Sequence, residues 1–151
     1  MTRQGHPPQL LLDNQLCFAL YRATRAVQRG YAPHLAELGL TYPQYLTMLV
    51  LWEADAALTV GAIGERLRLD SGTLTPLLKR LEDTGLVERR RDAADERRVN
   101  IALTDDGRAL RSRAEGVPAK VFACNGLTVA ESMALRDTLT ALSDRFEAAT
   151  A

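Results

Sequence analysis

One segment of this chain, residues 58–104, limits the possible folds more than any other. Its first part reads LTVGAIGERLRLDSGTLTPLLKRLEDTGLV and its second part reads ERRRDAADERRVNIALT. In the first part, two runs of apolar residues at helical spacing flank a polar turn, which predicts two short helices. In the second part, apolar and polar residues alternate on both sides of a charged turn, which predicts a hairpin. Two helices followed by an arginine-rich hairpin form a winged helix-turn-helix, which is suited to holding duplex DNA.

The second predicted helix has an apolar face and a polar face. Its leucines at positions 74, 77, 78 and 81 follow the i, i+3, i+4, i+7 rule and should face the core. The residues between them should face outward, where small hydroxyls and cations can contact bases or phosphates. We expect Thr59 to cap the first helix, Asp70 or Ser71 to cap the second, and Gly85 to end it. The DNA contacts predicted on this helix are Ser71, Thr73, Thr75, Lys79 and Arg80.

The predicted hairpin has strands at 86–91 and 98–103 and a charged tip at 92–97. An arginine at such a tip can enter a narrow minor groove, where the potential is most negative. The neighbouring carboxylates of Asp95 and Glu96 can hold the guanidinium of Arg97 in a fork-like pair. The alternative is a solvated hairpin whose charges only keep the chain soluble, but its place after a helix-turn-helix favours DNA. The contacts predicted in the wing are Arg90, Arg91, Arg97 and Arg98.

The composition permits this interpretation without requiring it. The chain has 151 residues, the size of one ordinary domain, and a formal net charge of zero. Zero net charge is mild evidence against a nucleic-acid binder, although the arginines of the predicted wing form a local cluster. There is no apolar run long enough for a membrane span and no signal-peptide pattern, so we expect a cytoplasmic protein with reduced cysteines.

Helices are predicted on both sides of the winged segment. A winged helix does not need them, so their apolar faces require a partner, most simply a second copy of the chain. The expected fold is therefore mostly helical with a small β-wing and with dimerisation helices at both ends. We expect N-terminal sensing and dimerisation helices at 9–57, the DNA-binding unit at 58–104, and C-terminal dimerisation helices at 105–151. The predicted flanking helices are Leu10–Arg29 ending at Gly30, Pro33–Leu38 closed by Gly39, one capped by Thr41, one from Thr104 to about Val117, and one opened by a Thr128–Glu131 capping box.

The organisation resembles the MarR family of winged-helix repressors over nearly the whole chain. Four stretches resemble its OhrR branch of organic-hydroperoxide sensors: LLLDNQLCFALY at 10–21, LGLTYPQYLTMLVLWE at 38–53, LDSGTLTPLLKRLE at 69–82 and DERR at 95–98. The resemblance implies a dimeric repressor that leaves its operator DNA when an N-terminal cysteine is oxidised by an organic hydroperoxide. No cofactor or metal is implied.

The first of the two cysteines, Cys17, has two interpretations. A free cysteine among apolar neighbours usually only packs. However, all four tyrosines lie between positions 21 and 45, and a tyrosine hydroxyl donated to sulfur favours the thiolate, which is the nucleophile toward a peroxide. The resemblance implies that Tyr31 and Tyr42 of the partner subunit bond Cys17. Tyr21 and Tyr45 are then expected in the core.

The second cysteine, Cys124, precedes the last predicted helix. It is either an unremarkable buried thiol or a resolving thiol that condenses with a sulfenic acid at Cys17. The resemblance to the two-cysteine branch of the OhrR sensors implies a disulfide across the dimer, and a small-molecule thiol is the alternative partner for Cys17.

Other chemistry finds little support in the sequence. His6 and His34 are far apart, and no CxxC or HExxH pattern accompanies them, so we expect no metal site. Two rival functions remain. A thiol peroxidase would use both cysteines but not the arginine-rich wing, so an enzyme is not favoured. A repressor of the same fold released by a non-covalent phenolic ligand would leave Cys17 merely packed.

Overall fold

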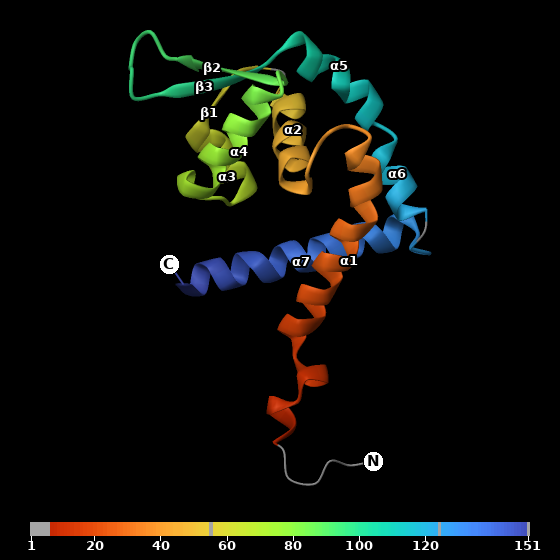
Figure 1. Ribbon diagram of the computed structural model, residues 1–151. Coiled ribbons are helices and arrows are strands. Elements are labelled where there is room, and N and C mark those ends of the chain that lie inside the picture. Colours follow the sequence, from red (N-terminus) through yellow and green to blue (C-terminus); the bar gives the residue numbers. More distant parts are fainter. Residues whose placement is uncertain (1–6, 55, 124, 151) are drawn as a thin grey trace. The chain divides into compact units, whose positions relative to one another are not determined.

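The computed structural model describes residues 7–54, 56–123 and 125–150 (Figure 1). The described residues fall into two units, Met1–Val117 and Pro118–Ala151. The first unit begins with two 3-10 turns, Pro8–Leu10 and Leu12–Asn14. The remaining elements are α1 (Leu16–Ala36), α2 (Tyr42–Ala54), β1 (Leu58–Thr59), α3 (Val60–Leu67), α4 (Ser71–Asp83), β2 (Val87–Arg91), β3 (Val99–Leu103), α5 (Asp105–Ala114), α6 (Val117–Phe122) and α7 (Val129–Thr150).

The winged helix-turn-helix is confirmed. Helices α3 and α4 precede a three-stranded antiparallel sheet of order β1–β3–β2. In this sheet Val87 pairs with Leu103 and Leu58 pairs with Ile101. Strand β1 was not predicted, because two residues are too few to show an alternating pattern. The fold is mostly helical with a small wing.

Side-chain caps fix where these helices begin. The Thr59 hydroxyl accepts a hydrogen bond from the Ala62 N–H at 3.1 Å, and the Asp70 carboxylate accepts one from the Thr73 N–H at 2.8 Å. Thr104 caps α5 in the same way through the N–H of Gly107 at 3.0 Å. Since each cap satisfies a backbone donor that the helix leaves unpaired, the polar residues identified in the sequence set the starts of α3, α4 and α5.

The N-terminal helix differs from the prediction. A single helix, α1, runs through both Gly30 and Pro33, so the expected end at Gly30 and the separate helix at Pro33–Leu38 are wrong. Tyr31 and Leu35 are buried, and this packing outweighs the cost of about 1 kcal/mol for a glycine inside a helix. Gly39 closes the segment as expected, with a φ of +68°.

Helix α2 forms the centre of the core. Its buried residues point in most directions around its axis: Gln44, Tyr45, Thr47, Met48, Val50, Leu51 and Trp52. It packs against α1, α3, α4, α5 and β3. The N-terminus has a reciprocal capping box, because the Gln44 side chain accepts from the Thr41 N–H at 2.8 Å while the Thr41 hydroxyl accepts from the Gln44 N–H at 3.5 Å.

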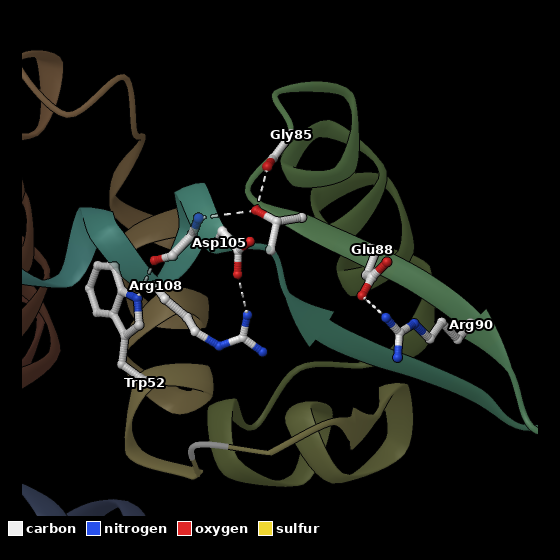
Figure 2. Close-up of polar contacts among 8 residues, drawn as sticks. Trp52, Gly85, Glu88, Arg90, Asp105 and Arg108 are labelled. Carbon is white, nitrogen blue, oxygen red and sulfur yellow. Dashed lines mark hydrogen bonds and ion pairs between the residues drawn. The ribbon is translucent and has the colours of Figure 1, made fainter.

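A close contact joins α2 to the helix that follows the wing. The indole N–H of Trp52 donates to the Gly107 carbonyl at 2.8 Å, and both groups are buried (Figure 2). A Cβ atom on Gly107 would lie 2.1 Å from the Leu86 carbonyl oxygen. Only glycine allows α5 to approach the backbone at the start of the wing this closely.

We predict that Gly107→Ala destabilises the fold by about 1–3 kcal/mol or more, because the backbone of Leu86 must move to admit the methyl group. Urea unfolding followed by circular dichroism measures the change. The matched control is Gly116→Ala, where an added Cβ meets nothing within 4 Å. Equal midpoints for the two variants would contradict the assignment of Gly107 as a close-packing position.

Candidate nucleic-acid interface and cysteine site

The outward face of α4 carries the polar residues expected there. Leu74, Leu78 and Leu81 are fully buried and Leu77 is half-buried, so the helix is oriented as predicted. The opposite face is free of large apolar side chains and is open to a ligand. Its exposed residues are Ser71, Thr73, Thr75, Lys79 and Arg80.

Electrostatics divide this helix along its length. Hydrogen bonds from the backbone and side chain of Thr73 hold the pKa of the Asp70 carboxyl below its usual range, so Asp70 is ionised at neutral pH. A negative charge at this end disfavours a close phosphate. Lys79 and Arg80 supply positive charge nine and ten positions after Asp70, which is roughly two and a half turns of helix. The hydroxyl groups between these two regions are therefore best placed for base edges, and the cations for the backbone.

The wing places its arginines on the surface. Arg90, Arg91, Arg97 and Arg98 are exposed. The Arg90 guanidinium forms an ion pair with Glu88 (Figure 2), and an exposed pair of this kind is weak enough to exchange for a phosphate. A hollow of about 410 Å³ lies between the wing and the helices, and its lining includes Arg89, Arg97, Arg98, Thr75 and Gly61. The hollow joins the wing to α3 and α4, and it adds Arg89, which the sequence analysis did not select.

The fork-like pair expected at the wing tip is absent from the described residues. The Asp95 carboxylate accepts instead from the backbone N–H of Arg97 at 3.0 Å, and that of Asp92 accepts from the N–H of Ala94 at 2.8 Å. The Ala94 bond is the main reason that the pKa of Asp92 lies below its usual range. Because the carboxylates shape the turn, the Arg97 guanidinium stays available to another partner.

Cys17 lies in the first turn of α1 and is exposed, with no disulfide. Within one chain it is therefore not packed in the core. Cys124, the expected resolving thiol, lies outside the described residues.

Three tyrosines form a cluster where α1 meets α2. The ring centroids of Tyr31 and Tyr42 are 5.2 Å apart, and those of Tyr31 and Tyr45 are 5.6 Å apart. Burial, followed by the proximity of Tyr45 and Tyr42, raises the pKa of Tyr31 to about 12, and burial also raises the pKa of Tyr42. Both hydroxyls therefore remain protonated and can donate a hydrogen bond at physiological pH.

Of the two tyrosines expected in the core, Tyr45 is buried and Tyr21 is not. Tyr21 is 56% exposed, and its hydroxyl accepts a hydrogen bond from Arg25 at 2.7 Å. The prediction for Tyr21 is wrong within one chain because residues 21–30 of α1 are all exposed, and the buried residues of this helix, Tyr31 and Leu35, lie beyond them.

The structure does not bring Cys17 and Tyr31 together within one chain. Both lie on α1, fourteen positions apart, which is about 21 Å along a helix at 1.5 Å per residue. These two side chains therefore cannot form a hydrogen bond with each other within one chain.

Comparison with known proteins identifies the family. The family model described as transcriptional regulator SarA/Rot matches residues 29–113. The regulator TtmR of Methylorubrum extorquens is 51% identical over 98% of this chain and 75% of its own length. The organic hydroperoxide resistance transcriptional regulator of Bacillus subtilis is 51% identical over 74% of this chain and 75% of its own length. The chain belongs to the MarR/SarA family of winged-helix transcriptional regulators.

Solved structures agree with this family. Reduced AbfR bound to DNA matches with a TM-score of 0.80 and 36% identity, covering 95% of this chain and 97% of AbfR. AbfR has also been solved overoxidised on DNA and in a disulfide form, with TM-scores of 0.72 and 0.63. A mutant of MarR from E. coli complexed with operator DNA matches with a TM-score of 0.74 and 25% identity, covering 84% of this chain and 92% of MarR. This protein is accordingly a DNA-binding regulator and not an enzyme.

Two further observations concern only the residues that the structure describes. No helix there is both long and apolar enough to cross a membrane. No three histidine, cysteine or acidic side chains in the same residues are grouped as metal ligands would be. His34 is half-buried, and His6 lies outside the described residues.

We predict that Arg97→Ala weakens DNA binding and lowers the slope of log affinity against log salt by about 0.9, the contribution of one neutralised phosphate. The preference of this variant for A·T-rich flanking sequence should also be weaker than that of the wild type, because narrow minor grooves occur in such sequence. A salt titration on matched duplexes measures both effects, with the exposed Arg111→Ala of α5 as control. An unchanged affinity and slope for Arg97→Ala would mean that the wing is only a solvated hairpin.

Proposed function

We propose that this protein is a redox-sensing transcriptional repressor, which binds operator DNA while Cys17 is reduced and leaves it when an organic hydroperoxide oxidises Cys17. The observation that carries the proposal is an exposed thiol in the first turn of α1, in the same unit as the winged helix. The relatives named for organic hydroperoxide resistance and for a disulfide form support the same chemistry.

Exposed apolar side chains support a homodimer. In the isolated chain they concentrate near the two ends, which is where the sequence predicts dimerisation helices. A monomer seldom leaves this much apolar surface in water, and a second copy covers it most simply. We assign residues 9–57 to sensing and dimerisation, 58–104 to DNA binding and 105–151 to dimerisation. The exposed residues include Leu10, Leu12, Leu16 and Val27 near the N-terminus, and Val129, Met133, Leu135, Leu139 and Phe146 on α7.

The dimer also supplies the tyrosine donors. Because about 21 Å of helix separates Cys17 from Tyr31 in one chain, an antiparallel approach of two α1 helices is needed to set the thiol of one subunit against Tyr31 and Tyr42 of the other. These hydroxyls stay protonated, as the raised pKa of each tyrosine requires. They would donate to the thiolate and orient it toward the peroxide.

The chemistry has two steps. The Cys17 thiolate attacks the distal oxygen of the hydroperoxide, the O–O bond breaks, and the departing alkoxide takes a proton, which leaves a sulfenic acid and an alcohol. The thiol of Cys124 in the partner then attacks the sulfenic sulfur, forming a disulfide and releasing water. A small thiol can replace Cys124 in this second step.

A cross-subunit bond can release DNA only by favouring one packing of the dimer over another. Duplex DNA fixes the spacing of the two half-sites near one helical turn or a multiple of it. A packing that moves the two winged helices away from this spacing binds the operator less tightly.

A gel shift on the protein's upstream DNA tests the proposal. It compares the reduced protein, the protein treated with cumene hydroperoxide, and the treated protein after addition of a dithiol. Binding that is insensitive to the hydroperoxide would reject it.

We predict that Cys17→Ser binds operator DNA with unchanged affinity but no longer responds to organic hydroperoxide. Serine preserves the size of the side chain but cannot form a sulfenic acid. Fluorescence anisotropy of a labelled operator, with and without cumene hydroperoxide, measures both properties. Release of this variant by the hydroperoxide would exclude Cys17 from the mechanism.

The tyrosine donors give a separate prediction. Tyr31→Phe and Tyr42→Phe should each slow Cys17 oxidation by about fivefold, because one neutral hydrogen bond contributes about 1 kcal/mol, and the double variant should be slower still. Stopped-flow measurement of thiol loss gives the rates, and Tyr21→Phe is the matched control on the exposed face of α1. Unchanged kinetics in the double variant would eliminate the two hydroxyls as activators.

Cys124→Ser should still oxidise at Cys17 but form no disulfide-linked dimer on a non-reducing gel. It should also over-oxidise more readily, because no second thiol traps the sulfenic acid. Intact-mass spectrometry after graded hydroperoxide separates these products. If oxidised wild-type protein runs only as a monomer, Cys124 is not an intersubunit partner.

A further inference from the structure

The hollow of about 410 Å³ between the wing and the helices, here called the wing hollow, has only positive side chains among its charged groups. Its lining includes Arg89, Arg97 and Arg98 but no carboxylate. In the part of the chain that the structure describes, no ion pair involves the Arg89 guanidinium. Three guanidinium groups around one hollow whose lining has no carboxylate create a positive potential, which attracts an anion.

The wing hollow lies where a strand of bound DNA has to pass. Its lining includes Thr75 of the outward face of α4 as well as the arginines of the wing, so the hollow lies between these two elements. When α4 occupies a major groove and the wing tip occupies the adjacent minor groove, one sugar-phosphate strand separates the two grooves. This strand therefore crosses between α4 and the wing, over the hollow.

Arg89 differs from the neighbouring arginine of β2 in the face that it occupies. Successive side chains of a strand point to opposite faces, so Arg89 shares a face with the buried Val87. Arg90 shares the opposite face with Glu88, its ion-pair partner (Figure 2). Arg89 is half-buried, and its backbone N–H donates to Glu82 at 3.3 Å. A side chain restricted in this way loses less freedom when it binds an anion than a fully exposed one does.

The wing hollow also contains a glycine that the fold does not require. Gly61 lies in the first turn of α3 and lines the hollow. An added Cβ atom would meet only the Thr59 hydroxyl, at 3.9 Å, which is an ordinary contact. Glycine is less favourable than alanine in a helix, so the chain itself gives no reason for it here. A close approach of another molecule to the backbone is a physical reason for glycine at such a position.

A second hollow borders the same turn of α3 but has a different balance of charge. It measures about 420 Å³ and shares Val60 and Gly61 with the wing hollow, but its lining has one arginine, Arg68, and two acidic residues, Glu65 and Asp70. Asp70 is ionised at neutral pH, because hydrogen bonds from Thr73 hold its pKa low. A phosphate is therefore favoured in the wing hollow over this second hollow.

We propose that the wing hollow seats one backbone phosphate of the operator, with the Arg89 guanidinium on the phosphate and Gly61 leaving room for the strand against α3. The inference rests on the DNA binding within the proposed function and deepens it by adding two residues to the interface, and it does not depend on the chemistry of the thiol. Because the phosphate is the same at every base pair, the seat positions the winged helix on the duplex and carries no direct sequence information.

The first test measures the charge, using reduced protein and fluorescence anisotropy on two labelled duplexes of equal length, the protein's upstream DNA and an unrelated sequence. Arg89→Gln should weaken binding to both duplexes by about eightfold per subunit at 0.1 M salt and lower the salt slope by about 0.9 per subunit, as one lost phosphate contact does. Arg89→Lys should keep part of the affinity, and the exposed Arg111→Gln of α5 should keep all of it. A loss confined to the upstream DNA, or no loss at all, would overturn the seat.

The second test locates the phosphate by placing single uncharged methylphosphonates along the upstream duplex. One position in each half-site should weaken binding of the wild-type protein, while Arg89→Gln should be insensitive there and still sensitive elsewhere, because groups in contact are not additive. Each protein serves as its own reference, so a change in the stability of Arg89→Gln does not affect the comparison. Equal sensitivity of the two proteins at every position would overturn the contact.

The third test uses Gly61→Ala, in which folding and binding should change in opposite directions. Urea unfolding should show a higher midpoint, since alanine favours a helix, whereas the affinity for both duplexes should fall severalfold. Gly116→Ala, where an added Cβ meets nothing within 4 Å, is the control for binding. A Gly61→Ala variant that binds as tightly as wild type would overturn the placement of the strand against α3. If the wild-type protein binds neither duplex, the proposed function fails, and the inference fails with it.

Discussion

The burial of α2 is the constraint on which the rest of the first unit depends. A helix with apolar residues around most of its circumference is stable only when other elements surround it, and here α1, α3, α4, α5 and β3 do so. One end of α2 contributes Tyr42 and Tyr45 to the tyrosine cluster with Tyr31. The other end contributes Trp52, whose indole bonds the backbone of α5. The tyrosine cluster and the contact with α5 beside the start of the wing therefore both depend on the same short, buried helix, α2.

Under the proposed function, this arrangement offers a route from the tyrosines to the DNA-binding face without a flexible relay. Close-packed interiors do not deform continuously, so a displaced α1 shifts α2 as a body or not at all. The loop before α4 also packs closely against α3, because a Cβ on Gly64 would lie 2.8 Å from the Leu69 carbonyl oxygen. Helix α4 is tied to the wing through Glu82, which accepts from the Arg89 N–H at 3.3 Å. These contacts join α3, α4 and the wing closely, so the proposed release of DNA would have to move them as one body.

The sequence predicted best where local chemistry decides the structure. Thr59, Asp70 and Thr104 cap the helices expected of them, and the alternation at 86–103 gave the wing correctly. The prediction from sequence failed where tertiary packing outweighs local helix propensity. Helix α1 continues through Gly30 because Tyr31, the next residue, is buried against α2. The prediction for Tyr21 failed because residue types do not show how far along a helix the core extends, and residues 21–30 of α1 are all exposed. The separation of Cys17 from Tyr31 also follows from the continuity of α1, which the sequence did not predict.

The zero net charge of the chain counted as mild evidence against DNA binding, and the structure explains why that evidence was misleading. Formal charges count a carboxylate and a guanidinium as equal, but several carboxylates here are engaged by backbone N–H groups. Asp70 caps α4, and Asp92 and Asp95 shape the wing turn. The arginines beside them are not engaged in the same way: Arg97 and Arg98 are exposed along the wing hollow. An anion approaching the wing meets exposed guanidinium groups, while the carboxylates of Asp92 and Asp95 accept hydrogen bonds from the backbone. Local geometry, rather than the sum of charges, therefore sets the potential that a duplex encounters.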